Sequence, residues 1–111
     1  MKYVQREIVL VPFPYSDLTS SKQRPALIIS NSKINCTEDR ICCLITSNPA
    51  TEGIHIDKKD FEKGTLPLES WVKPQRLFSV NEKIIRKSLC RINNSFHKKI
   101  INEIFEYLDC E

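Results

Sequence analysis

An arginine and two neighbouring hydroxyl residues are the side chains of this sequence best suited to phosphate chemistry. Arg24 ends a polar stretch and stands directly before the apolar run that begins at Pro25. A guanidinium held at the base of a buried strand offers a planar fork of donors that fits a phosphate. Thr46 and Ser47 end another apolar run, where hydroxyls can line a cleft. A solvated arginine, a strand threonine and a turn-capping serine are the ordinary structural explanations of the same residues.

Other common catalytic arrangements have no support in the sequence. No histidine lies near Thr46 or Ser47 to act as a base, which argues against a serine hydrolase. We expect His55 on the exposed face of a strand and His97 in the first turn of a helix, neither of them catalytic. The fourteen acidic residues are scattered, without the spacing of a two-metal nuclease, so we expect no metal ion and no cofactor. Two glycines are too few for a glycine-rich phosphate loop.

A second group of polar residues surrounds Pro74. Lys73, Gln75 and Arg76 alternate around this strand break and could add a basic edge that binds a polyanion. A charged edge strand that discourages aggregation explains them equally well. The formal net charge of +3 permits a polyanionic partner but is far below that of a histone-like arm.

Length and composition favour a single small cytoplasmic domain. The chain has 111 residues, 41% of them hydrophobic, so we expect residues 1–111 to share one core. No apolar run approaches the roughly 18 residues of a membrane span, and the N-terminus is charged. The five cysteines are an odd number without a C-x-x-C pair, so we expect reduced and mostly buried thiols. Adjacent Cys42 and Cys43 should point to opposite faces of a strand.

Short β-branched runs bounded by turn residues predict a mainly β protein. The pattern places strands at residues 7–13, 25–30, 41–47, 54–57, 71–78 and 89–92, with a polar loop over 15–24 and a turn over 64–67. The internal proline of the 71–78 segment predicts an edge strand or a bulge. Within residues 80–89 we expect a short helical turn capped by Asn81.

The periodicity changes to that of a helix after Asn94. One helical face carries Phe96, Ile100, Ile101, Ile104, Phe105 and Leu108. Several short strands followed by one capped amphipathic helix predict a small, strongly bent antiparallel barrel with the C-terminal helix packed across it.

Taken together, these segments resemble the MazF/PemK family of toxin endoribonucleases from toxin–antitoxin pairs. The matching stretches are Glu7-Ile-Val-Leu-Val-Pro-Phe, a polar loop, Arg24-Pro-Ala-Leu-Ile-Ile-Ser, Leu44-Ile-Thr-Ser, residues 71–80 and the amphipathic helix. They follow the family's order over nearly the full length. The most specific part is the Arg-Pro strand followed some twenty residues later by Ile-Thr-Ser.

The resemblance implies an SH3-like barrel similar to that of the CcdB toxins, a homodimer, sequence-selective cleavage of single-stranded RNA at short sequences, and a cognate antitoxin partner. By position, Arg24 and Thr46 match the family's catalytic arginine and threonine. We expect RNA to be bound by further polar residues around them: Asp17, Lys22, Ser47, Lys73, Gln75 and Arg76. The basic residues of this set lead us to expect an acidic, partly disordered antitoxin.

Two departures from the family pattern bear on activity. The usual opening Gly-Asp is Arg6-Glu7, which should change only the entry turn. Where some members carry an Arg-x-Asp pair, this chain has Lys73-Pro74-Gln75, so it lacks the carboxylate base proposed for them. The substrate's own 2′-OH can still attack the phosphorus, with Asp17 as a candidate base. The missing acid leaves open a non-catalytic binding module of the same fold, either an inactive relative or a gyrase-binding toxin like CcdB.

Overall fold

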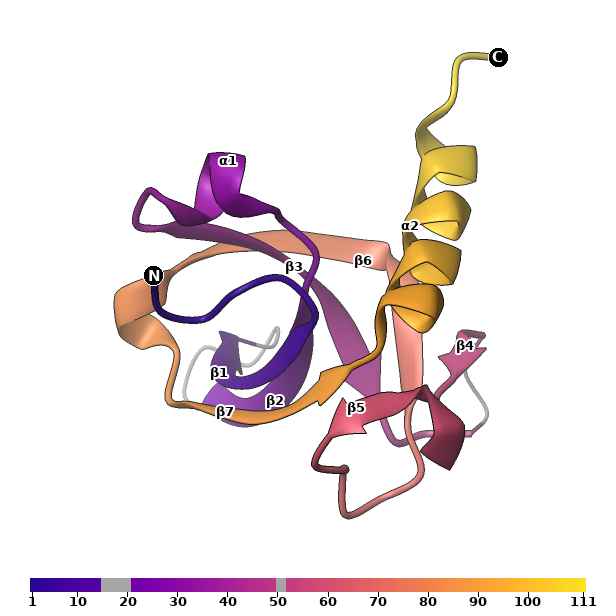
Figure 1. Cartoon of the computed structure of the whole chain (residues 1–111), viewed down its shortest axis with the longest axis horizontal. Helices are drawn as coiled ribbons and strands as arrows, with labels where there is room; N and C mark the ends of the chain where they lie inside the picture. Colours follow the sequence, from indigo (N-terminus) through magenta and orange to yellow (C-terminus); the bar gives the residue numbers. More distant parts are fainter. Residues whose placement is uncertain (15–20, 50–51) are drawn as a thin grey trace.

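The computed structural model describes residues 1–14, 21–49 and 52–111, and within them one curled sheet carries a helix at its side (Figure 1). The seven strands lie in the order β4-β6-β3-β2-β1-β7-β5, and all six pairs of neighbours are antiparallel. Their bounds are β1 Glu7–Pro14, β2 Ser21–Ile28, β3 Asp39–Thr46, β4 Ile54–His55, β5 Phe61–Lys63, β6 Trp71–Asn81 and β7 Lys87–Ile92. The helices are α1 Ser32–Asn35 and α2 Asn94–Leu108, with 3-10 turns at Lys58–Asp60 (η1) and Glu82–Ile84 (η2). The predicted mainly β architecture with a C-terminal helix is confirmed.

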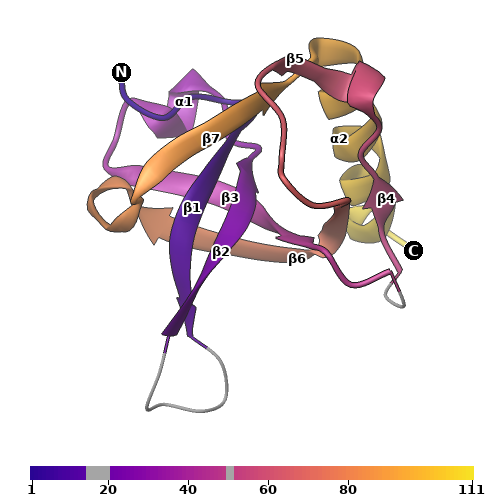
Figure 2. The same ribbon diagram turned by 90° about the horizontal axis from the view of Figure 1, so that it is seen from below.

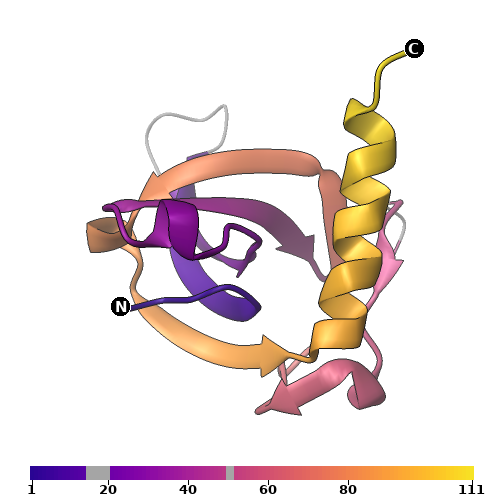
Figure 3. The same cartoon turned by 45° about the horizontal axis from the view of Figure 1, so that its top comes forward.

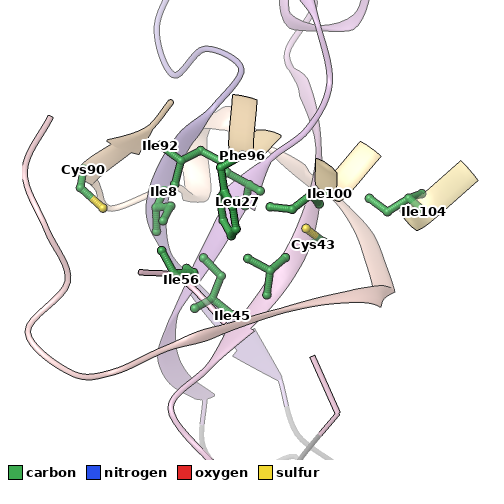
Figure 4. Close-up of a cluster of buried hydrophobic side chains, with 11 residues drawn as sticks. Ile8, Leu27, Cys43, Ile45, Ile56, Cys90, Ile92, Phe96, Ile100 and Ile104 are labelled. Carbon is green, nitrogen blue, oxygen red and sulfur yellow. The ribbon is translucent and has the colours of Figure 1, made fainter. Parts of the chain in front are cut away.

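The main hydrophobic core lies between the concave face of the sheet and α2. The helix contributes Phe96, Ile100 and Ile104, which recur every four residues and therefore share one face (Figure 4). They pack against strand residues that include Ile8 and Leu27. Figure 3 shows α2 lying across the open side of the sheet. Among the described residues, no helix is long and apolar enough to cross a membrane.

A second apolar cluster fills the opposite face of the central strands. It contains Val9, Val11, Ala26, Ile28, Cys42, Val80 and Ile85. Cys42 belongs to this cluster whereas Cys43 belongs to the main core, so the predicted alternation is confirmed. Burial raises the pKa of the Cys42 thiol to about 12 and raises the pKa of Cys43 as well. Three of the five free thiols are buried, as predicted for most of them, and Cys36 and Cys110 are exposed.

The β1–β2 hairpin is longer than the sequence indicated. Strand β2 begins at Ser21, not at Pro25, and its register with β1 extends to the pair Pro14↔Ser21. The hairpin therefore projects beyond the rest of the sheet (Figure 2). Residues Ser21 to Arg24 belong to a strand and not to the expected loop, because cross-strand pairing overrides their polar composition. The remaining loop residues, 15–20, lie outside the described part of the chain.

The 71–78 segment is a bulged inner strand. Leu44 pairs with Lys73 while Cys43 pairs with Leu77, so residues 74–76 are extra on β6. This confirms the bulge predicted from Pro74. The edge position is wrong, because β6 lies between β3 and β4.

The sequence predicted the start of α2 better than its last turn. The side chain of Asn93 accepts a hydrogen bond from the Phe96 amide at 2.8 Å and caps the start of the helix. At the other end Phe105 and Leu108 are 65% and 68% exposed, so they lie outside the buried face to which periodicity assigned them. Ile104, the residue before Phe105, is buried, so the packed face of the helix is narrower than periodicity indicated. The cap that Asn81 makes on η2 is confirmed, whereas α1 and β5 were not predicted.

Arg6, which replaces the expected glycine, keeps a glycine-like backbone. Its φ of 78° lies in the left-handed region that disfavours other L-residues. The guanidinium donates to the Ile92 carbonyl at 3.1 Å and to Glu62 at 2.9 Å. Arg6 therefore also connects the start of β1 to β5 and β7, which the sequence did not indicate.

Candidate active site

The candidate catalytic residues lie where β2 and β3 stop pairing. The last bridged pair is Ala26↔Leu44, next to Pro25, which has no N–H to donate. Arg24 is two residues before Ala26 and Thr46 two residues after Leu44, so both lie at the same corner of the sheet. Because side chains alternate along a strand and paired residues share a face, the two side chains belong to the same face.

A cavity of about 360 Å³ opens at this corner. Its polar wall is formed by Gln23, Arg24, Ser47, Ser70 and Lys87, and its apolar wall by Leu10, Pro25, Ile45, Leu66, Pro67, Leu68 and Leu89. The cavity is therefore a place where cationic and hydroxyl groups meet an apolar surface. This combination suits a phosphate that is attached to a ribose or a base.

The cavity adds residues that the sequence did not single out. Lys87 reaches this corner because Leu10 of β1 pairs with Pro25 on one side and with Lys87 on the other. Ser70 is buried and comes from the segment before β6. The adjacent cations Arg86 and Lys87 were a visible signal, but their location depends on the strand order.

The other predicted RNA-binding residues are only partly brought together. Lys22 is exposed on the projecting hairpin, and Lys73 is half-buried opposite Leu44. Arg76 is exposed in the β6 bulge. Gln75 lines a different cavity, of about 420 Å³, next to Glu103 and Tyr107 of α2. Asp17 lies outside the described residues.

The two histidines have different environments. His97 is 5% exposed in α2, and its burial, assisted by the nearby Arg6 charge, lowers its pKa to about 4. His55 is exposed on β4, as predicted. Its Nε2 lies 2.7 Å from the Glu69 carboxylate, and its ring centroid lies 5.3 Å from that of Trp71. These contacts were invisible in the sequence.

Within the described residues, no group of three or more histidine, cysteine, aspartate or glutamate side chains could hold a metal ion. What the corner does offer is a guanidinium, a lysine and hydroxyls around an open cavity. Such donors bind a phosphodiester and stabilise negative charge that develops on its oxygens.

Comparisons with known proteins agree with this geometry. Residues 4–108 match the model of a family described as PemK-like, MazF-like toxins of type II toxin–antitoxin systems. No curated protein matches the sequence. Three similar solved structures share the fold at low sequence identity.

The first is an endoribonuclease in complex with its cognate antitoxin from a mycobacterial species, with a TM-score of 0.76, 17% identity, and coverage of 96% of this chain and 94% of that one. The second is MazE–MazF from Deinococcus radiodurans, with a TM-score of 0.78, 16% identity, and coverage of 97% and 96%. The third is the Mycobacterium tuberculosis toxin MazF-mt6, with a TM-score of 0.73, 15% identity, and coverage of 96% and 99%.

Proposed function

This chain belongs to the family of PemK-like, MazF-like toxins of type II toxin–antitoxin systems, and from that premise we propose that it is a metal-independent endoribonuclease acting on single-stranded RNA. The observation that carries the proposal is that strand register brings Arg24 and Thr46 to one corner of the sheet. Arg24 and Ser47 line the cavity of about 360 Å³ at this corner, whereas Thr46 is not part of its wall. Solved structures of similar fold include proteins described as endoribonucleases. The 111 residues act as one domain in this proposal, and the cytoplasm is where the RNA is met.

In the proposed reaction the ribose 2′-oxygen attacks the adjacent phosphorus. The 2′-oxygen loses its proton, the bond from phosphorus to the 5′-oxygen breaks, and the leaving oxygen gains a proton. The products are a 2′,3′-cyclic phosphate and a free 5′-OH. Arg24 stabilises the charge that gathers on the phosphoryl oxygens, and the Thr46 hydroxyl donates to one of them. A guanidinium stays protonated, so Arg24 does not remove the proton.

The remaining predicted residues have secondary roles. Ser47 and Lys87 extend the donor set along the cavity wall, and Lys22, Lys73 and Arg76 attract the RNA backbone. Gln75 cannot accept a proton and lines a different cavity, so it takes no part in the chemical step.

The sharpest test replaces one 2′-OH of the substrate with hydrogen, on the 5′ side of the scissile phosphate. Cutting at that bond should stop, while binding should fall much less, because binding rests on phosphate charge and base stacking. Wild-type cleavage should continue in EDTA. Cleavage of the deoxy-substituted bond, or a requirement for added Mg²⁺, would overturn the mechanism. An RNA mixture that stays intact would support the non-catalytic binding module instead.

We also propose that the chain pairs with an acidic antitoxin and with a second copy of itself. Similar solved structures include complexes with an antitoxin. Exposed apolar side chains are available for such contacts: Leu77, Ile84, Phe105, Tyr107 and Leu108. Sedimentation of the isolated chain should show a species heavier than the 12.9 kDa monomer, and the antitoxin complex should weaken as salt is raised. A monomer at micromolar concentration, or a complex indifferent to salt, would contradict these expectations.

A further inference from the structure

We infer that Trp71, supported by His55 and Glu69, stacks against the base of a nucleotide next to the reacting phosphate. This inference rests on the proposed RNA-cutting function and assigns a subsite to it. Four observations support it: strand register, the contacts of the two rings, the distance from Thr46, and the position of a nearby cation.

The register places Trp71 and His55 in line with the candidate catalytic threonine. Thr46 of β3 pairs with Trp71 of β6, and Trp71 pairs in turn with His55 of β4. Figure 1 shows β4 beside the end of β6 that is distant from η2. Directly paired residues of antiparallel strands share a face of the sheet. Thr46, Trp71 and His55 therefore form one row across three strands, on the face to which Arg24 also belongs.

The two rings are held in a defined arrangement. Their centroids are 5.3 Å apart and their planes are tilted by 51°. His55 Nε2 lies 2.7 Å from Glu69, and His55 Nδ1 lies 4.0 Å from Asp57. The close approach of β4 depends on Gly53, because a Cβ at that position would come within 2.9 Å of the Val72 carbonyl oxygen and within 3.1 Å of the Trp71 Cβ. A preorganised aromatic pair costs little entropy when a base stacks on it.

The aromatic pair of Trp71 and His55, which we call the platform, is accessible at the protein surface. Trp71 is half-buried and His55 is exposed. His55 and Glu69 also border a cavity of about 750 Å³ whose wall includes Leu66, Pro67 and Leu68, residues that also line the cavity beside Arg24. The segment before β6 therefore borders both cavities, one lined by Arg24 and the other by His55, the residue that pairs with Trp71.

The distance along the row favours binding and not proton transfer by His55. Two strand spacings separate the backbones of Thr46 and His55, which corresponds to roughly 10 Å. A general base must come within about 3 Å of the proton that it removes. A phosphate held by Thr46 is therefore out of direct reach of His55, whereas a neighbouring nucleotide is within reach.

A cation lies where the RNA backbone of such a nucleotide would run. Lys73 is two residues after Trp71 on β6, before the bulge, so its side chain shares the face of Trp71. An aromatic ring with a cation beside it is the usual composition of a single-strand binding surface. Stacking on one aromatic side chain changes affinity by about tenfold to a hundredfold, so the contact is measurable.

Trp71 is the only tryptophan of the chain, so its fluorescence reports on the subsite directly. The first experiment titrates the protein with single-stranded RNA that carries a 2′-deoxy sugar at the scissile position, so that it is bound but not cut. Saturable quenching of Trp71 is expected, and an RNA that lacks the base beside the scissile phosphate should quench much less. Equal quenching by both RNAs would overturn the inference.

Matched substitutions at one position form the second experiment. Trp71→Leu should weaken binding of fluorescein-labelled RNA by about tenfold to a hundredfold, whereas Trp71→Phe, which keeps a stacking ring, should stay within a fewfold of wild type. If Trp71→Leu does not fold, His55→Ala replaces it, because His55 is exposed. That variant should bind RNA severalfold more weakly and change the quenching of Trp71.

The outcomes separate this inference from the proposed function. Arg24→Lys should lose cleavage and keep Trp71 quenching. If RNA quenches Trp71 but the wild type cleaves no RNA, the proposed endoribonuclease activity is refuted and base stacking on Trp71 is supported. Normal cleavage with unchanged RNA affinity in Trp71→Leu, or in His55→Ala, would refute base stacking on Trp71 and support the proposed endoribonuclease activity.

Discussion

The two ends of the β3–β6 strand pair are built in opposite ways. At one end Arg40 pairs with Val80, is 1% exposed, and is closed over by the N-terminal residues. At the other end Thr46 pairs with Trp71 near two open cavities. The same two strands thus carry the buried guanidinium of Arg40 at one end and a solvent-accessible row of polar and aromatic side chains at the other.

The sealed end shows what a structural arginine requires. Arg40 donates to the carbonyls of Lys2, Tyr3, Thr37 and Asp39 at 2.6–2.8 Å, and to Glu82 at 3.0 Å. These partners hold the N-terminal residues against β3 and η2. Arg24, by contrast, borders a cavity large enough for part of a nucleotide. The comparison suggests that stability depends on the Arg40 end and activity on the Arg24 end.

Replacing Arg40 should have the largest effect on the fold. Arg40→Met should lower the free energy of unfolding by about 3–5 kcal/mol, because buried carbonyls and the Glu82 carboxylate lose their partner. Urea unfolding followed by circular dichroism measures this loss. Glu82→Gln is the matched control and should cost less, since Arg40 keeps its four carbonyl partners. A stable Arg40→Met protein would remove the basis of the comparison.

Replacing the residues at the open end should affect activity and leave the fold intact. Arg24→Lys keeps the charge but loses the planar two-point grip on phosphate, so cleavage should slow by about 10²- to 10³-fold. Thr46→Val keeps the β-branched shape and should be similarly slow if the hydroxyl contacts the phosphate. RNA cleavage rates and melting temperatures are measured together. Wild-type rates in both variants would show that the site is elsewhere.

Acid should destabilise the fold through His97, which lies at neither end of this strand pair. Its pKa of about 4 in the folded protein lies below the ordinary value of 6.5, so the unfolded state binds more protons between these values. The stabilisation is complete above pH 6.5 and is lost as pH falls to 4, by about 3 kcal/mol in total. His97→Leu should flatten this part of the stability profile. An unchanged profile in the variant would assign the acid sensitivity to other groups.

The smallest effect is expected at Arg6, outside both ends. Arg6→Gly relieves the left-handed backbone cost of about 1 kcal/mol. It also removes the ion pair with Glu62 and the hydrogen bond to the Ile92 carbonyl, which act in the opposite direction. The net change in unfolding free energy should stay within about 1 kcal/mol, with RNA cleavage unchanged. Because Glu62 also pairs with Arg91 at 3.6 Å, a double-mutant cycle of Arg6→Gly with Glu62→Ala isolates the Arg6–Glu62 contribution. A loss of cleavage in Arg6→Gly would extend the active region to the start of β1.

Several elements could be predicted because their signals are local. β1 was evident from its β-branched run, the start of α2 from its periodicity and cap, and the β6 bulge from Pro74. The start of β2 was missed because Ser21 to Arg24 are polar, and only pairing with β1 makes them a strand. The exposure of Phe105 was missed because it lies around the helix from the packed face: its neighbour Ile104 is buried, and only the packing against the sheet shows where that face ends.

The sequence by itself determined the family, the order along the chain of every strand except β5, and the presence of an arginine and a threonine suited to phosphate. The tertiary structure decided which residues meet. It brought Lys87 to Arg24 through β1, aligned Thr46, Trp71 and His55 across three strands, and turned Gln75 toward α2. The physical reason is that strand register and bulges set these contacts, and they depend on backbone hydrogen bonds between segments distant in sequence.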